Sequence, residues 1–150
     1  ADVGEVIRPI GFWRSKSLLC VVASELIVSD YGGQVPSTME DLTRLPGVGR
    51  KTANIVLNKA FGICEGIAVD THVYRIASRL RLTKADTPLA AEQDLLALIP
   101  SELWSPVNEQ WIHFGREVCM ARSPRCAECQ LADLCPSAGQ PNRYFKGKAK

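Results

Sequence analysis

Four of the six cysteines lie close together near the C-terminus, and this cluster constrains the fold more than any other feature. They are separated by six, two and five residues: Cys119, Cys126, Cys129 and Cys135. The opening residues do not resemble a secretion signal, so we expect reduced thiols rather than disulfides. Four thiolates at this spacing indicate a metal site, and both a zinc ion and an iron–sulfur cluster accept such a set. The spacing alone leaves these two alternatives open.

The rest of the chain shows helical periodicity, without alternating apolar and polar stretches between hairpin turns. We therefore predict an all-α fold. The expected helices cover residues 3–8, 15–29, 37–45, 49–61 and 70–82, with one opening at Pro88 and a last one from 105 to about 119. Ser37 and Glu40 suggest a capping box, and Asp70 and Thr87-Pro88 are helix-start signals.

The second of these helices is expected to bury one side against the core, and the two isolated cysteines to behave as small core residues. The predicted buried side consists of Leu18, Leu19, Val22, Leu26 and Ile27, and the isolated cysteines are Cys20 and Cys64.

Composition gives only weak information about partners. The chain has 150 residues, of which 46% are hydrophobic and 23% charged, as in ordinary globular domains. No apolar run approaches the roughly 20 residues of a membrane span, so no membrane partner is expected. The net charge of +2 comes from the tail, where four basic residues and no acid follow residue 135; the remainder has 14 basic and 16 acidic groups. Any DNA binding must therefore depend on local placement of charge.

A glycine-rich turn, Leu45-Pro46-Gly47-Val48-Gly49, separates two of the predicted helices. A helix that begins after such a turn points free amides and a positive dipole end outward, which suits a phosphate oxygen. The alternative is a plain helix-to-helix turn. Lys51 follows in the first helical turn, where it is either a solvated surface lysine or an amine able to attack carbon. Asp70 is either a helix cap alone or a rigid carboxylate that stabilises positive charge or relays a proton.

The segments LPGVGRKTANIVLN (45–58) and AVDTHVYR (68–75) resemble the helix-hairpin-helix DNA glycosylases of the endonuclease III type. This resemblance covers about residues 3–135. It implies that Lys51 attacks C1′ of a damaged nucleotide, that a Schiff base leads to strand cleavage by β-elimination, and that Asp70 is the accompanying aspartate. It implies double-stranded DNA with an oxidised pyrimidine or an abasic site as substrate, with mismatched uracil or thymine as the alternative.

The resemblance also assigns further residues. It makes Cys119, Cys126, Cys129 and Cys135 the ligands of a [4Fe-4S] cluster, and it makes Phe12 the apolar wedge that fills the gap left by a flipped nucleotide. Phe12 as a core residue is the alternative for that position, and Trp13 is expected to be buried. Arg122 and Arg125 are equally compatible with phosphate contacts and with a solvated surface. Backbone contacts to DNA are expected from the hairpin and its exit: Leu45, Gly47, Val48, Gly49, Arg50 and Thr52.

We expect three segments: a helical domain over 1–115 that forms part of a six-helix barrel, a cluster loop over 116–136 and a basic tail over 137–150. Family members carry additional helices before the point matched by Val3, so we expect exposed apolar faces. The isolated chain is expected to be poorly soluble or partly ordered, with weak or absent activity. A monomer in the nucleoid of a prokaryotic cytoplasm is expected. A DNA-binding module without catalysis is the competing hypothesis, and the pairing of Lys51 with Asp70 argues against it.

Overall fold

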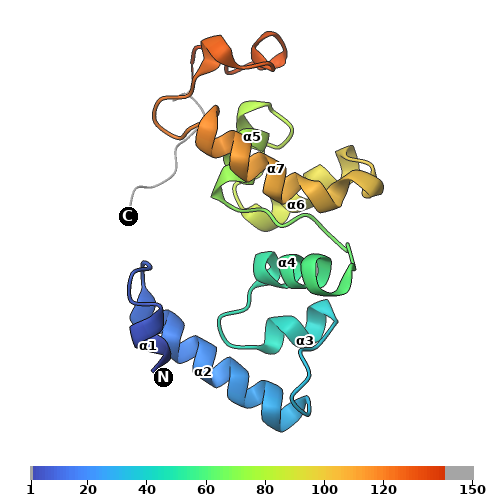
Figure 1. Cartoon of the computed structure of the whole chain (residues 1–150). Helices are drawn as coiled ribbons and strands as arrows, with labels where there is room; N and C mark the ends of the chain where they lie inside the picture. The colour runs from blue at the N-terminus through green and yellow to red at the C-terminus, as the bar shows by residue number, and fades with distance from the viewer. Residues whose placement is uncertain (1, 141–150) are drawn as a thin grey trace. The chain divides into compact units, whose positions relative to one another are not determined.

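The computed structural model describes residues 2–140, and within that range the chain is helical without strands (Figure 1). The α-helices are α1 Val3–Val6, α2 Trp13–Asp30, α3 Met39–Arg44, α4 Arg50–Phe61, α5 Thr71–Arg79, α6 Pro88–Leu98 and α7 Trp104–Glu117. Short 3-10 helices are η1 Ser101–Leu103, η2 Cys126–Glu128 and η3 Ala132–Leu134. The all-α prediction is confirmed. The basic side chains expected in the tail lie outside the described residues.

Local capping chemistry explains where several helices begin. Asp70 caps α5 by accepting from the amides of His72 and Val73, and Thr87 caps α6 ahead of Pro88, both as predicted. The prediction of Ser37 as the cap of α3 is wrong. The cap is Thr38, whose hydroxyl oxygen accepts from the Asp41 amide at 3.1 Å.

The predicted end of α5 at residue 82 is also wrong. The helix ends at Arg79, and Arg81 adopts a φ of 57° in the left-handed region, which interrupts the helical backbone. This kind of boundary depends on the contacts of the following loop, and no glycine or proline at this point signals it.

The chain divides into two compact units, one ending at Ile63 and the other starting at Cys64. In the first unit, α3 and α4 pack against each other around the buried side chains Leu42, Leu45, Ala53 and Leu57. Ala23, Leu26 and Ile27 of α2 pack on the same cluster. This small core fixes the hairpin between α3 and α4.

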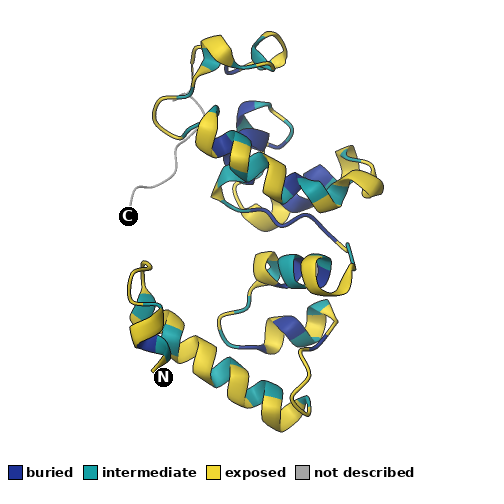
Figure 2. Ribbon diagram, viewed as in Figure 1, coloured by how far each residue is buried: buried dark blue, intermediate teal, exposed yellow. Residues whose placement is uncertain are grey.

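The predicted buried side of α2 is not found: the helix has no buried residue, and Val22, Leu26 and Ile27 are only half-buried (Figure 2). Leu18 and Leu19 are 64% and 37% exposed, and Cys20, expected in the core, is exposed as well. Burial of a helix face requires a packing partner, and the partly buried α2 residues that pack on the α3–α4 core are Ala23, Leu26 and Ile27. Cys64 is half-buried.

In the second unit α5 packs against α6 and α7. Its core consists of Ile67, Val69, Val73, Ala77, Ala91, Leu95 and Val107. Because α5 supplies side chains to this core and is capped by Asp70, the position of that carboxylate is set by well-packed structure. None of the described helices is both long and apolar enough for a membrane span.

Candidate functional site

The hairpin over residues 45–49 is fixed by its backbone and by one neighbouring side chain. Leu45 is buried, and its carbonyl accepts from the Val48 amide at 3.0 Å. Gly47 has a φ of 81°, a conformation in which a side chain is strained. A Cβ at Gly47 would also lie 3.1 Å from the Leu19 side chain, so α2 packs directly on the turn. The contact with Leu19 was not foreseen from the sequence, which gave no sign of which residue faces the turn.

The helix that leaves the hairpin has the features of an anion site. Its N-cap, Gly49, has no side chain with which to cap the first turn. Amides in the first turn of a helix have no partner within the helix and lie at the positive end of its dipole. Lys51 and Thr52 in this turn are exposed. Backbone donors can therefore meet a phosphate while the amine of Lys51 stays accessible to a ligand.

Phe12 is a highly exposed aromatic residue held in an unusual backbone conformation. It is 85% exposed and has a φ of 58°, which costs a non-glycine residue about 1–2 kcal/mol. Its carbonyl accepts from the Ser15 hydroxyl and the Lys16 amide, each at 3.0 Å, which anchors it at the start of α2. In this structure Phe12 is therefore not part of the core. Trp13, expected to be buried, is half-buried.

Asp70 is positioned by the helix that it caps and by a buried segment before it. Its Oδ1 accepts from the amides of His72 at 2.8 Å and Val73 at 2.9 Å. Both of these bonds use Oδ1, which leaves Oδ2 outside the cap. The preceding residues 67–69 are buried, and the Asn108 side chain donates to the Ala68 carbonyl at 2.7 Å. The result is a half-buried carboxylate with a fixed orientation.

One turn further along α5, Arg75 connects this helix to the start of the cluster loop. Its guanidinium donates to the carbonyls of Cys119 at 3.0 Å and Gly115 at 2.9 Å, and it lies 3.0 Å from Nδ1 of His72. Burial lowers the pKa of Arg75 from its ordinary value, and the charge of Cys119 opposes that shift.

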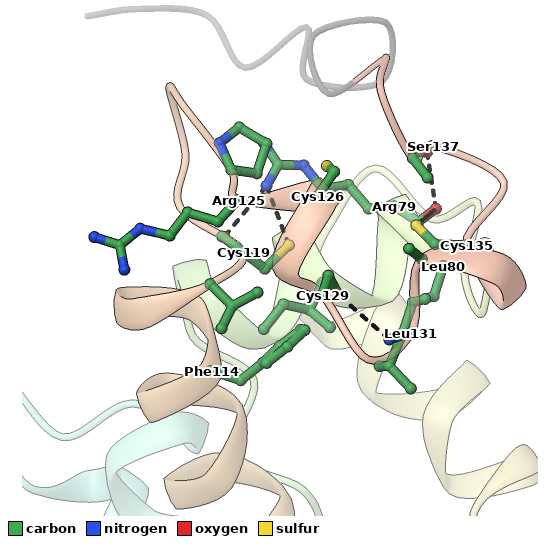
Figure 3. Close-up of a pocket in the computed structure, with 15 residues that line it drawn as sticks. Arg79, Leu80, Phe114, Cys119, Arg125, Cys126, Cys129, Leu131, Cys135 and Ser137 are labelled. Carbon is green, nitrogen blue, oxygen red and sulfur yellow. Dashed lines mark hydrogen bonds between the residues drawn. The ribbon is translucent and has the colours of Figure 1, made fainter.

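The four cysteines line one pocket, shown in Figure 3. Its apolar walls come from α5, α7 and the loop, and they include Ile76, Leu80, Phe114, Val118 and Leu131. In the described chain no three metal-binding side chains converge closely enough for a single metal ion. The four thiolates would instead hold an iron–sulfur cluster, in which the ligands bind several metal atoms rather than one.

The donors around the pocket fit sulfur ligands. Nη1 of Arg79 lies 3.2 Å from Sγ of Cys119, and the amide of Leu131 donates to Sγ of Cys129 at 3.4 Å. Hydrogen bonds to the sulfurs are characteristic of protein sites for iron–sulfur clusters. The apolar walls and these donors are compatible with an iron–sulfur cluster on the four cysteines.

The predicted site residues are divided between the two units. Phe12, the hairpin and Lys51 belong to the first unit, whereas Asp70 and the four cysteines belong to the second. Arg122 and Arg125, both in the cluster loop, are exposed. Sequence reasoning overlooked Arg75 and Arg79, which are four residues apart on the amphipathic helix α5 and are both buried.

Together, the hairpin between two helices and the cysteine-lined pocket define the chain as a helix-hairpin-helix protein with an iron–sulfur domain. The helix-hairpin-helix motif family matches residues 30–59, and the iron-sulfur binding domain of endonuclease III matches residues 119–135. The chain is thus similar to the endonuclease III family. An iron–sulfur cofactor, expected from the resemblance, is thereby confirmed.

Named relatives agree with this assignment. Endonuclease III of Synechocystis sp. is 51% identical over 137 residues, which cover 91% of this chain and 63% of that protein. Endonuclease III of Bacillus subtilis is 48% identical over 135 residues, which cover 89% of this chain and 61% of that protein. The chain thus spans about three fifths of the length of these relatives.

Solved structures also show similarity to endonuclease III. A trapped covalent intermediate of endonuclease III with DNA is 41% identical and superimposes with a TM-score of 0.85 over 91% of this chain and 64% of that one. A thermostable thymine-DNA glycosylase is 26% identical, with a TM-score of 0.73 over the same shares of the two chains. Both the identity and the TM-score are higher for the endonuclease III structure.

Proposed function

We propose that this chain carries the chemistry of a bifunctional DNA glycosylase and AP lyase that removes oxidised pyrimidines and cleaves the resulting abasic site. The observation that carries this proposal is the exposed amine of Lys51, in the first turn of α4 directly after the hairpin. The greater likeness to endonuclease III than to the thymine-DNA glycosylase supports oxidised pyrimidines over mismatched uracil or thymine.

In the proposed reaction, the unprotonated Nζ of Lys51 attacks C1′ of the damaged nucleotide. The bond between C1′ and the base breaks, and the base leaves with the bonding electron pair and takes up a proton. Ring opening then gives a Schiff base between Lys51 and the sugar, and loss of a C2′ proton expels the 3′ phosphate by β-elimination. Asp70 stabilises the positive charge that develops at the sugar and relays the proton from the amine.

DNA is proposed to bind through the backbone around the hairpin. The amides in and after the turn hold a phosphate oxygen, which gives affinity without sequence preference. The residues assigned to this contact are Leu45, Gly47, Val48, Gly49, Arg50 and Thr52. Phe12 is proposed to enter the duplex where the damaged nucleotide has left the stack. Its high exposure and its anchored backbone support this wedge role.

Cys119, Cys126, Cys129 and Cys135 are proposed as the ligands of a [4Fe-4S] cluster. When bound, the cluster supplies a rigid electrostatic centre for the loop and takes no direct part in base removal. Arg122 and Arg125 on this loop are proposed to contact DNA phosphates, which their exposure permits. The chain is proposed to consist of three segments: a helical domain over 1–115, the cluster loop over 116–136 and a basic tail over 137–150. A monomer bound to chromosomal DNA in a prokaryotic cytoplasm completes the proposal.

Borohydride trapping tests the proposed nucleophile. The iron-loaded chain is mixed with duplex DNA that contains one abasic site, and borohydride reduces any Schiff base to a stable adduct. We expect an adduct with the wild-type chain and with the control Lys59→Ala, which removes another exposed lysine of α4, and none with Lys51→Ala. An undiminished adduct with Lys51→Ala would exclude Lys51 as the nucleophile. DNA binding without any adduct in the wild-type chain would favour the non-catalytic module.

A further inference from the structure

Arg79, the last residue of α5, places a positive charge in the interior of the second unit. Its side chain is 4% exposed. The guanidinium donates to the carbonyls of Cys119, Met120 and Ala121 at 3.2, 2.7 and 3.0 Å. Its remaining acceptor is Sγ of Cys119, at 3.2 Å. None of these acceptors is a carboxylate, although a buried charge is costly unless it is paired.

The backbone of Arg79 holds the other end of the cluster loop. Its carbonyl accepts from the Ser137 hydroxyl at 2.8 Å, and Sγ of Cys135 lies 3.8 Å from the same oxygen. The segments containing the first and the last cysteine are therefore both attached to this one residue (Figure 3). Ser137 is itself 2% exposed, so this attachment lies within the packed interior.

We propose that Arg79 is a positioning residue that serves as the built-in counter-ion of the iron–sulfur cluster and sets its reduction potential. This inference rests on the proposed role of Cys119 as a cluster ligand. Four thiolates make the cluster site strongly negative, and the buried guanidinium supplies the opposite charge at hydrogen-bonding distance from one of the sulfurs. Charge and hydrogen bonds at the sulfurs favour the reduced cluster, so they raise its potential.

Two variants of Arg79 can separate the effect of its positive charge from the effect of its hydrogen bonds. Arg79→Lys retains the positive charge but cannot reach all four acceptors, because an ammonium is a single point rather than a planar fork. Arg79→Gln removes the charge and most of the donors. Arg116→Gln is the matched control, because it makes the same change at an exposed position on α7 of the same unit.

The experiment measures two quantities on the iron-loaded full chain: the reduction potential of the cluster by voltammetry, and the rate of cluster loss to an iron chelator by visible absorbance. For Arg79→Gln we expect a more negative potential and cluster loss roughly 10- to 100-fold faster, because removing a group that orients metal ligands typically lowers metal affinity by about that factor. For Arg79→Lys we expect faster loss but a potential closer to that of the wild type. Arg116→Gln should match the wild type in both measurements.

An iron-loaded Arg79→Gln chain with wild-type potential and wild-type cluster retention would overturn this inference alone. A wild-type chain without iron would overturn the proposed ligand set and this inference with it. If Arg79→Gln fails to fold, as judged by circular dichroism, the lysine variant decides. Faster cluster loss from Arg79→Lys with a nearly unchanged reduction potential would then support the inference. Cluster loss from Arg79→Lys at the wild-type rate would overturn it.

Discussion

Replacing Gly115 by alanine tests whether the contact between α5 and α7 is as close as the structure indicates. A Cβ at Gly115 would lie 2.6 Å from Nδ1 of His72, 2.9 Å from Nη2 of Arg75 and 3.1 Å from Cβ of His72. Two of these atoms belong to a histidine whose ring cannot simply swing away, because α7 packs directly on α5. The third belongs to a buried guanidinium that already donates to the Gly115 carbonyl.

Two effects of the substitution on the free energy of unfolding oppose each other. The higher helix propensity of alanine stabilises the chain, and the steric clash destabilises it by more. Alanine favours a helix interior by about 1 kcal/mol over glycine. Overpacking costs about 1–3 kcal/mol, and disturbing a buried hydrogen bond from a charged group costs about 1.5–3 kcal/mol. The net expectation for Gly115→Ala is a loss of about 3 kcal/mol in the free energy of unfolding of the second unit. With an m-value of about 2 kcal/mol per molar urea, the midpoint falls by about 1.5 M.

The assay is urea unfolding of the iron-loaded chain, followed by helical circular dichroism and by cluster absorbance. Gly11→Ala is the matched control, because a Cβ there meets nothing within 4 Å and the backbone is not in the left-handed region. We expect this control to unfold within about 0.5 kcal/mol of the wild type. A Gly115→Ala chain as stable as the wild type would refute the argument, since it would mean that α5 and α7 can separate without cost.

Two further predictions concern the proposed chemistry. Asp70→Asn keeps a good helix cap, so α5 should remain folded, but the variant loses the negative charge of the carboxylate. Single-turnover base excision should therefore slow about 100-fold or more. Excision at the wild-type rate would show that the carboxylate charge is not needed. Phe12→Ser should leave stability nearly unchanged, because the ring is 85% exposed, while affinity for abasic duplex in a binding titration should fall about tenfold through loss of the wedge. Ile10→Ser in the same loop should bind nearly as the wild type, and equal losses in the two variants would argue against a specific role for Phe12.

The features that could be predicted were those determined by residues close together in the sequence. Asp70 and Thr87 carry their own capping oxygens, so the starts of α5 and α6 followed from single residues. Thr38 and Ser37 are neighbours with similar chemistry, and only the backbone geometry decides which of them caps α3. The turn over residues 45–49 was evident from its glycines, and the cysteine spacing indicated a metal site.

Features that depend on distant segments could not be predicted in the same way. Leu18 and Cys20 have core-like side chains, but burial is decided by what packs on a helix face, and periodicity carries no information about the partner. Arg79 looks like an ordinary surface residue until the carbonyls of residues 119–121 are found around its guanidinium. Likewise, Gly115 resembles a poor helix former, and its role becomes clear only where His72 and Arg75 meet it.

The central claim is that Lys51 forms the Schiff base with abasic DNA. Peptide mass spectrometry of the borohydride-trapped wild-type adduct tests this most directly, because it identifies the lysine that carries the sugar remnant. The proposed mechanism predicts the remnant on the peptide containing Lys51 and no other. A remnant on another lysine, or on the N-terminal amine, would contradict it.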